Sequence, residues 1–143
     1  MPGDALTETK VTHSLVTALR AVPGFASVDE RMLLALIGDS ANLFWPVDAV
    51  VFERGTPADG LYIIVSGSVR VIDRDGGEVA VLGPGDFFGE LSLLLDTTHR
   101  HDIRIAEDAE LMILPKDRLD ELTASHPELG RAIRQRAEER LAI

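Results

Sequence analysis

The spacing of apolar residues divides the chain into a helical segment, a series of short strands and a second helical segment. Over residues 5–40, apolar positions recur three and four residues apart, as they do on one face of an α-helix. Within this segment we expect a helix with Ser27 as its N-cap and Glu30 completing a capping box. Residues 116–143 return to the helical spacing, and Pro127 is expected to divide them into two helices.

The residues between these helices form short runs rich in Val and Ile, separated by Gly, Pro and Asp. Hairpin turns are expected at residues 66–67 (Ser-Gly) and 75–77 (Asp-Gly-Gly). Strands at this spacing favour a jelly-roll or a related barrel. We therefore predict one mainly β domain over residues 1–143, with a jelly-roll-like β-roll at 43–115 and short flanking N- and C-terminal helices.

Composition and length are those of an ordinary globular domain. With 143 residues and 45% apolar residues, the chain can bury a core without disulfides or metals. It contains no Cys, which excludes a disulfide scaffold, a thiolate metal site and a Cys nucleophile. The N-terminal residues lack the pattern of a secretory signal, and the apolar runs are far shorter than the roughly 18 residues of a membrane-spanning helix. We expect a cytoplasmic protein without a membrane partner.

The charge balance argues against a nucleic-acid partner. The chain has 24 acidic and 14 basic residues, which gives a net charge of −10. Affinity for nucleic acids depends mainly on Lys and Arg side chains that displace counterions from phosphates, so an acidic domain is a poor candidate. Four arginines do fall within residues 131–140, where we expect a solvated helix face.

The segment GELSLLL, at residues 89–95, has a helical character although it lies between two expected strands. A helix that begins there would offer unpaired N–H groups and a partial positive charge, which suit a phosphate group. Gly89 lets an anion approach the backbone closely, and Glu90 can accept a hydrogen bond from a ligand hydroxyl. On these residues alone, a helix cap at Glu90 and a tight turn at Gly89 explain the pattern equally well.

Residues 88–94, FGELSLL, match the phosphate-binding cassette of the cyclic nucleotide-binding domain family at every position. The stretch FERGTPADGLYIIVSGSVRV at 52–71 also resembles a motif of this family, and the resemblance extends over about residues 18–141. It implies a β-roll with an internal cassette helix that binds cAMP or cGMP without chemical turnover. Such a domain is regulatory, has no catalytic residues and needs no cofactor.

The resemblance also implies roles for individual residues. Glu90 would accept a hydrogen bond from the ribose 2′-OH, and the backbone N–H groups of Gly89, Leu91 and Ser92, next to Phe88, would hold the cyclic phosphate. An Arg that follows the cassette in this family pairs with the phosphate. The C-terminal helix would close over the base and relay binding to the rest of the protein.

The sequence departs from the family at that Arg. It lies nine residues after the cassette Glu, or ten in some members, and these positions hold His99 and Arg100 here. With nine residues, Ile103 takes an inward strand position, whereas with ten Arg104 would take it. Because strand side chains alternate between two faces, the nine-residue register is favoured. A bulge could still let Arg100 reach the phosphate.

The departures predict weaker binding. Loss of a charge-assisted hydrogen bond, which contributes about 1.5–3 kcal/mol, would weaken the affinity roughly tenfold to a hundredfold. A protonated His99 would recover part of this and make the affinity depend on pH near its ordinary pKa of about 6.5. His101 would crowd the pocket, and the carboxylate of Asp102 would repel the phosphate. The expected binding site therefore comprises residues 88–92 together with His99, Arg100 and His101.

Alternatives remain open at this point. The altered residues after the cassette could have closed the site, so that the fold serves as an interaction module. His99 and His101 alternate as in the H-x-H metal sites of cupins, but the carboxylate and the later His of that pattern are missing, and we predict no metal site. Ile133, Ala137 and Leu141 could pair two chains or hold a partner domain, or could equally pack on the roll.

Overall fold

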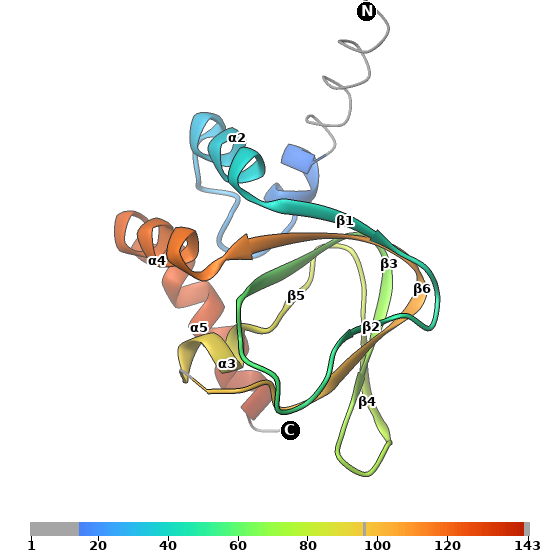
Figure 1. The fold of residues 1–143 in the computed structure, drawn as a ribbon. Helices are drawn as coiled ribbons and strands as arrows, with labels where there is room; N and C mark the ends of the chain where they lie inside the picture. Colours follow the sequence, from blue (N-terminus) through green and yellow to red (C-terminus); the bar gives the residue numbers. More distant parts are fainter. Residues whose placement is uncertain (1–14, 96, 142–143) are drawn as a thin grey trace, which may run out of the picture.

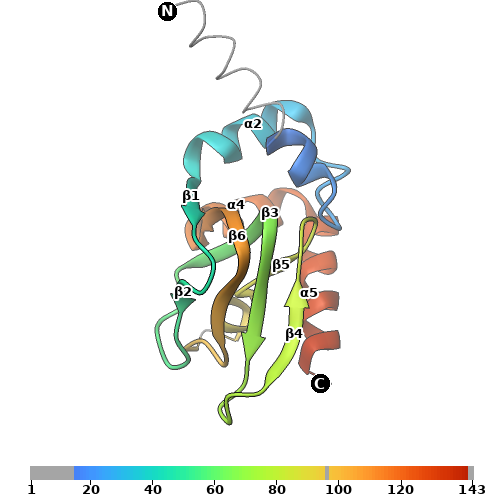
Figure 2. The same ribbon diagram turned by 90° about the vertical axis from the view of Figure 1, so that its right-hand side faces the viewer.

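The computed structural model describes residues 15–95 and 97–141. Part of the expected first helix, residues 5–14, therefore lies outside the described residues. Residues 15–20 are helical, and the next helix, α2, spans Glu30–Asp39. These helices lie at one end of the roll, as Figures 1 and 2 show.

The cap of α2 differs from the prediction. Asp29 is the N-cap, and its carboxylate accepts a hydrogen bond from the N–H of Met32 at 2.8 Å. Ser27 still belongs to the preceding turns, where its hydroxyl donates to the carbonyl of Gly24 at 3.4 Å. Asp29 has the extended backbone that an N-cap needs, so the prediction of Ser27 was wrong by two residues.

An antiparallel sheet curls around the interior of the molecule (Figure 1). The described residues contain six strands: β1 (Ala41–Trp45), β2 (Val50–Phe52), β3 (Gly60–Ile72), β4 (Glu78–Leu82), β5 (Phe87–Phe88) and β6 (Asp102–Pro115). The main strand order is β1-β6-β3-β4, while β2 pairs with β6 and β5 pairs with β3. All of these pairs are antiparallel. The mainly β, roll-like fold is therefore confirmed.

Gly67 lies in a bulge and not in the expected hairpin turn. β3 continues through it as one strand, and the pairing of β3 with β6 shifts register on both sides of it. Its φ is +78°, and a Cβ there would collide with the carbonyl of Asp108 and lie 2.7 Å from the Cα of Ala109. A bulge and a tight turn both require glycine for its positive φ, and this shared requirement explains the wrong prediction.

The turn at residues 75–77 is confirmed. It joins β3 and β4, which pair antiparallel, and Gly76 has a φ of +83°. The side chain of Asp73 accepts hydrogen bonds from the N–H groups of Asp75 at 3.0 Å and Gly77 at 2.9 Å. A carboxylate that satisfies local backbone donors in this way stabilises a turn.

β3 separates two hydrophobic cores. Leu61 and Ile63 belong to the core beneath the helices, whereas Tyr62 and Ile64 belong to the core inside the roll. Successive side chains of a strand point to opposite faces, and this alternation produces the division. The site described below lies at the end of the roll where β5 pairs with Tyr62 and Ile63.

The C-terminal segment forms two helices, α4 (Lys116–Ser125) and α5 (Pro127–Leu141), and the predicted division at Pro127 is confirmed. Ile133 and Ala137 are buried, so this face of α5 packs within the domain. α5 contacts the short helix α3 (Glu90–Leu94) and runs alongside the roll in Figure 2. This packing connects the end of the chain to the cassette.

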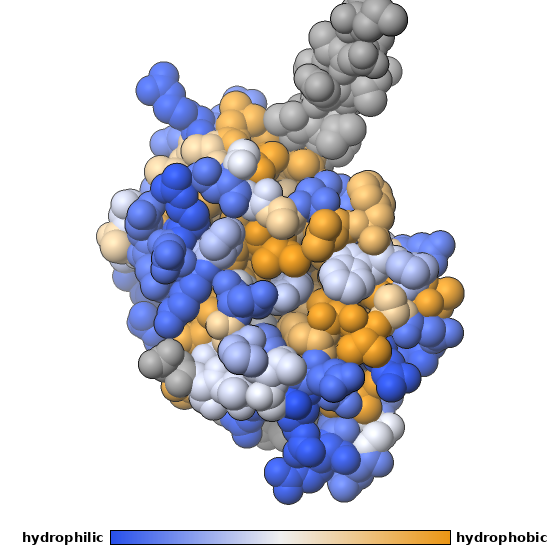
Figure 3. All heavy atoms as spheres, viewed as in Figure 1, coloured by the Kyte–Doolittle hydropathy of each residue, from blue (hydrophilic) through white to orange (hydrophobic). Residues whose placement is uncertain are grey.

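The surface in Figure 3 is mostly hydrophilic over α4 and has apolar side chains near the middle of the face. The exposed large apolar residues of the described chain are Leu34, Leu43, Phe44, Val47, Val50, Val79, Val81, Leu94 and Leu95. None of the helices within the described ranges combines the length and the apolar character that crossing a membrane would require.

Candidate functional site

The cassette begins at a glycine that cannot easily be replaced. β5 ends at Phe88, Gly89 follows with a φ of +89°, and α3 starts at Glu90. A Cβ on Gly89 would lie 3.2 Å from the carbonyl oxygen of Gly60 and 3.4 Å from Cδ1 of Tyr62. The residue thus makes a sharp turn where another chain segment passes close by. The short helix predicted at this position is confirmed, and the N–H groups of its first turn have no partner within the helix.

A cavity of about 270 Å³ lies beside this turn. All eight residues predicted for the binding site line it: Phe88, Gly89, Glu90, Leu91, Ser92, His99, Arg100 and His101. Other residues from four strands, a turn and a helix complete it: Phe52, Val71, Asp73, Val79, Ala80, Leu82, Ile103 and Arg140. The fold therefore brings the predicted residues together, and most of the remaining wall is apolar.

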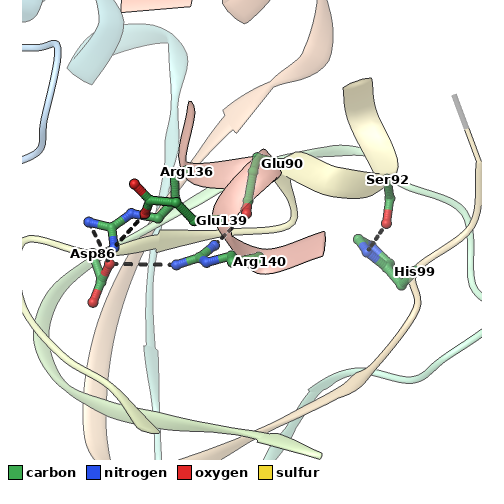
Figure 4. A network of polar contacts seen from close by, with 7 residues as sticks. All are labelled: Asp86, Glu90, Ser92, His99, Arg136, Glu139 and Arg140. Atoms are coloured by element: carbon green, nitrogen blue, oxygen red, sulfur yellow. Dashed lines mark hydrogen bonds and ion pairs between the residues drawn. The ribbon is translucent and has the colours of Figure 1, made fainter. Parts of the chain in front are cut away.

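Glu90 is a buried carboxylate with a cationic partner. Its side chain is 1% exposed, and Oε1 lies 2.5 Å from Nη1 of Arg140 (Figure 4). Burial raises the pKa of Glu90, because desolvation penalises the charged form, and the nearby Arg140 lowers it in part. The acidic residue that resemblance assigns to the ribose is thus held by an ion pair.

His99 packs tightly against the aromatic side of the cavity. Its ring stacks on Phe52 with a centroid distance of 3.6 Å and an interplanar angle of 5°. Its Nδ1 lies 3.3 Å from the hydroxyl of Ser92, and the side chain is buried (Figure 4). Burial lowers the pKa of His99, although the charge of Asp59 opposes this. At neutral pH the ring is therefore neutral and cannot replace the positive charge of the family's Arg.

The register predicted after the cassette is confirmed. Ile103 and Ile105 are buried inside the roll, and Arg104 is exposed. Arg100 is exposed and lines the cavity, so its guanidinium can meet an anion at the entrance. His101 also lines the cavity; burial and the adjacent Arg100 lower its pKa.

Asp102 lies outside the cavity, which corrects the expectation that it repels a bound phosphate. Its Oδ1 accepts a hydrogen bond from the backbone N–H of Arg54 at 2.7 Å. Its side chain faces a separate depression lined by several charged residues, among them Arg74 and Arg104. Asp102 is the neighbour of the inward Ile103, and alternation along the strand turns it to the opposite face.

Arg140 is one of the cavity residues that the sequence analysis did not predict, and it contacts Glu90. We expected the arginines of residues 131–140 to be solvated, but Arg136 is half-buried, Arg140 is only 18% exposed, and both approach Asp86. The helical spacing of the sequence did indicate that Arg140 lies near the buried face of this helix. Arg140 follows Ala137 by three residues and Arg136 by four, so it lies near the buried face of α5.

The described part of the chain contains no cluster of side chains that could bind a metal ion. No three His, Asp or Glu side chains there gather in a way that could hold an ion. His99 is stacked on Phe52 and directs Nδ1 towards Ser92, so the H-x-H pair offers no open pair of nitrogen ligands.

Comparison with known proteins agrees with this geometry. A family model described as the cyclic nucleotide-binding domain matches residues 43–126, which is more than half of the chain. The CRP-like cAMP-activated global transcriptional regulator of Mycobacterium tuberculosis is 31% identical over 110 residues, covering 74% of this chain and 49% of that protein. Lysophospholipase NTE1 of Phaeosphaeria nodorum is 34% identical over 82 residues, covering 54% of this chain and 5% of that enzyme.

A solved structure shows the same architecture. The regulatory domain of Toxoplasma gondii PKA, determined with cAMP, has a TM-score of 0.71 and 29% identity, covering 78% of this chain and 44% of that one. The chain thus spans half or less of the length of these relatives. The matching residues include the cassette, α4 and every residue of the cavity lining except Arg140. The chain belongs to the cyclic nucleotide-binding domain family.

Proposed function

We propose that this domain binds a cyclic nucleotide, cAMP or cGMP, and acts as a non-catalytic regulatory unit of a cytoplasmic protein. The observation that supports this most strongly is the convergence of all eight predicted residues on one cavity of about 270 Å³. Glu90 would accept a hydrogen bond from the ribose, and the backbone N–H groups at Gly89, Leu91 and Ser92 would face the phosphate. The domain would relay binding through α5, which contacts the cassette helix.

The phosphate needs a cation, and Arg100 suits this role better than His99. Arg100 is an exposed guanidinium on the cavity wall, whereas His99 is buried, neutral and stacked on Phe52. A guanidinium keeps its charge at any physiological pH. We therefore expect the affinity to change little between pH 7.5 and pH 6, since a lowered pKa leaves His99 unprotonated over much of this range.

Calorimetric titration of cAMP and cGMP at pH 6 and pH 7.5 tests the proposal. Glu90→Ala should weaken binding about tenfold to a hundredfold, because a hydrogen bond to a charged group contributes about 1.5–3 kcal/mol. Glu53→Ala is a matched control, since this exposed carboxylate lies outside the cavity. A stronger response at pH 6 that is lost in His99→Gln would identify His99 as the phosphate partner.

The alternative is a domain that keeps the fold but no longer binds a cyclic nucleotide and serves as an interaction module. The packing of His99 against Phe52 favours this alternative. His99 lies nine residues after Glu90, where the family resemblance implies the phosphate-binding Arg. Absence of heat at millimolar ligand, from protein shown to be folded by circular dichroism, would support this alternative over ligand binding.

A further inference from the structure

β1 is an edge strand with one side unpaired in the described part of the chain. It pairs antiparallel with β6 from Ala41 to Trp45, and no other described strand pairs with it. In Figure 2, β1 lies at the outside of the sheet next to β6. An edge strand directs a row of N–H and C=O groups outward, and another strand can pair with them.

The other edges of the sheet have features that hinder such pairing, whereas β1 has none of them. β2 is only three residues long, and its pairing with β6 shifts register. β4 begins with the charged Glu78, and its pairing with β3 also shifts register. The five residues of β1, ANLFW, include no charge and no proline, and their register is unbroken. Natural proteins keep edges unpaired by short strands, charges, prolines and bulges, so β1 is the unprotected edge among the described strands.

The side chains of β1 leave large apolar groups in solvent. Phe44 is 77% exposed, and Leu43 is 43% exposed. Successive residues of a strand point to opposite faces, so each face of the sheet has one exposed apolar side chain at this edge. A second strand that pairs with β1 would cover part of both side chains.

We propose that β1 pairs antiparallel with β1 of a second copy of this chain, so that two sheets join into one. An uncharged strand offers no charge complementarity to an acidic or a basic partner. It is complementary to itself: with a two-fold axis at Leu43, this residue meets its counterpart, and each Phe44 meets Asn42 of the other copy. Side chains opposite each other in this way pack together, and a patch that contacts itself about a two-fold axis gives a closed dimer.

The acidic charge of the chain determines how this dimer responds to salt. The net charge is −10, and Glu110 lies opposite Phe44 on β6. In the dimer the two Glu110 residues are at least three strand spacings apart, or about 14 Å. This exceeds the Debye length of about 8 Å at physiological ionic strength, so salt screens their repulsion. Because a contact between two five-residue strands is small, we expect a weak dimer that salt strengthens.

Sedimentation velocity of the protein from about 10 to about 500 µM tests the proposal, since association grows with concentration. The average mass should rise towards that of a dimer, and more so at about 0.5 M than at about 0.05 M salt. Phe44→Lys should abolish the association, because a lysine on an edge strand blocks pairing, and the exposed position should tolerate it. Val81→Lys is the matched control: it places the same charge at a residue of β4 that is 55% exposed, and this variant should associate like the unaltered protein.

An introduced cysteine reports the register of the pairing, because the chain has no Cys of its own. Leu43→Cys places two thiols opposite each other at the two-fold axis. Opposite residues of antiparallel strands have Cα atoms about 4.5–5.5 Å apart, which is within the range of disulfides. Under mild oxidation Leu43→Cys should therefore form a disulfide-linked dimer at least about tenfold faster than Val81→Cys.

Three outcomes would overturn the proposal. The first is a protein that stays monomeric at every concentration and salt, which would leave the edge for a strand of a different protein. The second is a dimer that persists in Phe44→Lys, and the third is a dimer that Val81→Lys abolishes, since each would place the contact on another surface. None of these measurements uses a nucleotide, so this proposal and the proposed function can fail independently.

Discussion

The cassette, residues 88–94, and the segment that follows it, residues 97–102, differ in what holds them. Gly89 and the start of α3 are held by close backbone packing, since a Cβ added to Gly89 would lie 3.2 Å from the carbonyl oxygen of Gly60. The later segment is held by backbone hydrogen bonds between His99 and residues 55–56, and in addition by side chains. His99 stacks on Phe52, and Asp102 accepts from the N–H of Arg54. Close backbone packing therefore fixes the cassette, whereas in the later segment the side chains of His99 and Asp102 also stabilise the fold.

This difference shows how a binding site can keep its shape and lose part of its charge. The cavity, Glu90 and the first turn of α3 remain in place. Nine residues after Glu90, where the family resemblance implies an Arg, the chain has the buried imidazole of His99, whose pKa is lowered by burial. Shape and positive charge are therefore separable properties of this site, and they can be tested separately.

The largest effect is expected from Gly89→Ala. It should lower the free energy of unfolding by about 2–3 kcal/mol, since a left-handed φ strains any L side chain and the new Cβ approaches Gly60. Gly76→Ala is the matched control, with a similar φ of +83° but open space around it, and should lose only about 1–2 kcal/mol. Urea denaturation measures both. Equal losses would show that close approach at the cassette contributes nothing.

Restoring the family's residue should have the next largest effect. His99→Arg is expected to tighten cAMP binding about tenfold, because a charge-assisted hydrogen bond to the phosphate contributes about 1.5 kcal/mol or more. His101→Arg adds the same charge at another residue of the cavity lining, and the same calorimetric titration compares the two positions. The new guanidinium would add to the charge that Arg100 is proposed to supply. An unchanged affinity in His99→Arg would show that a cation at this position does not reach the phosphate.

A smaller effect is expected at Asp102. Asp102→Ala should lower the free energy of unfolding by about 1 kcal/mol, since the N–H of Arg54 loses its acceptor. Asp102→Asn keeps an acceptor oxygen and should lose less. Neither variant should change ligand affinity more than about twofold, because the side chain lies outside the cavity. Tighter binding in both would place the carboxylate near the phosphate after all.

The smallest effect concerns pH. The folded protein lowers the pKa of His99 below the ordinary 6.5, chiefly through burial. Below pH 6.5 the unfolded chain therefore binds a proton that the folded chain does not, and stability falls as the pH falls. The urea midpoint should decline from about pH 7.5 to about pH 5.5, and less so in His99→Gln.

The shifted pKa values of His101 and Glu90 also affect how stability depends on pH between about 5.5 and 7.5. His101 acts in the same direction as His99, so His101→Gln provides a comparison. Glu90 acts in the opposite direction, because its raised pKa makes stability fall as the pH rises above 4.5. The series is therefore repeated in Glu90→Gln. A midpoint that does not respond to His99→Gln in either background would contradict the buried, neutral imidazole.

The sequence predicted those parts of the molecule that depend on local pattern. The cassette helix, the inward Ile103 and the division at Pro127 all follow from spacing within a few residues. Asp102 was also within reach, since the alternation that turns Ile103 inward turns its neighbour outward. Gly67 was misread because a positive φ does not distinguish a bulge from a turn.

The ion pair between Glu90 and Arg140 could not be read from local pattern. Its partners are 50 residues apart, and only the packing of α5 against the cassette brings them together. The helical spacing indicates which face carries Arg140 but not which element that face meets. Contacts of this kind depend on the tertiary arrangement, which a single sequence does not specify in its local pattern.

The alternation along β3 has a consequence for how the domain unfolds. Leu61 and Ile63 complete one core and Tyr62 and Ile64 the other, so a single strand forms a shared wall. Removing that strand would open both cores at once, and neither can melt while the other stays intact. Heat or urea should therefore produce one sharp transition, with the helical and β signals lost together.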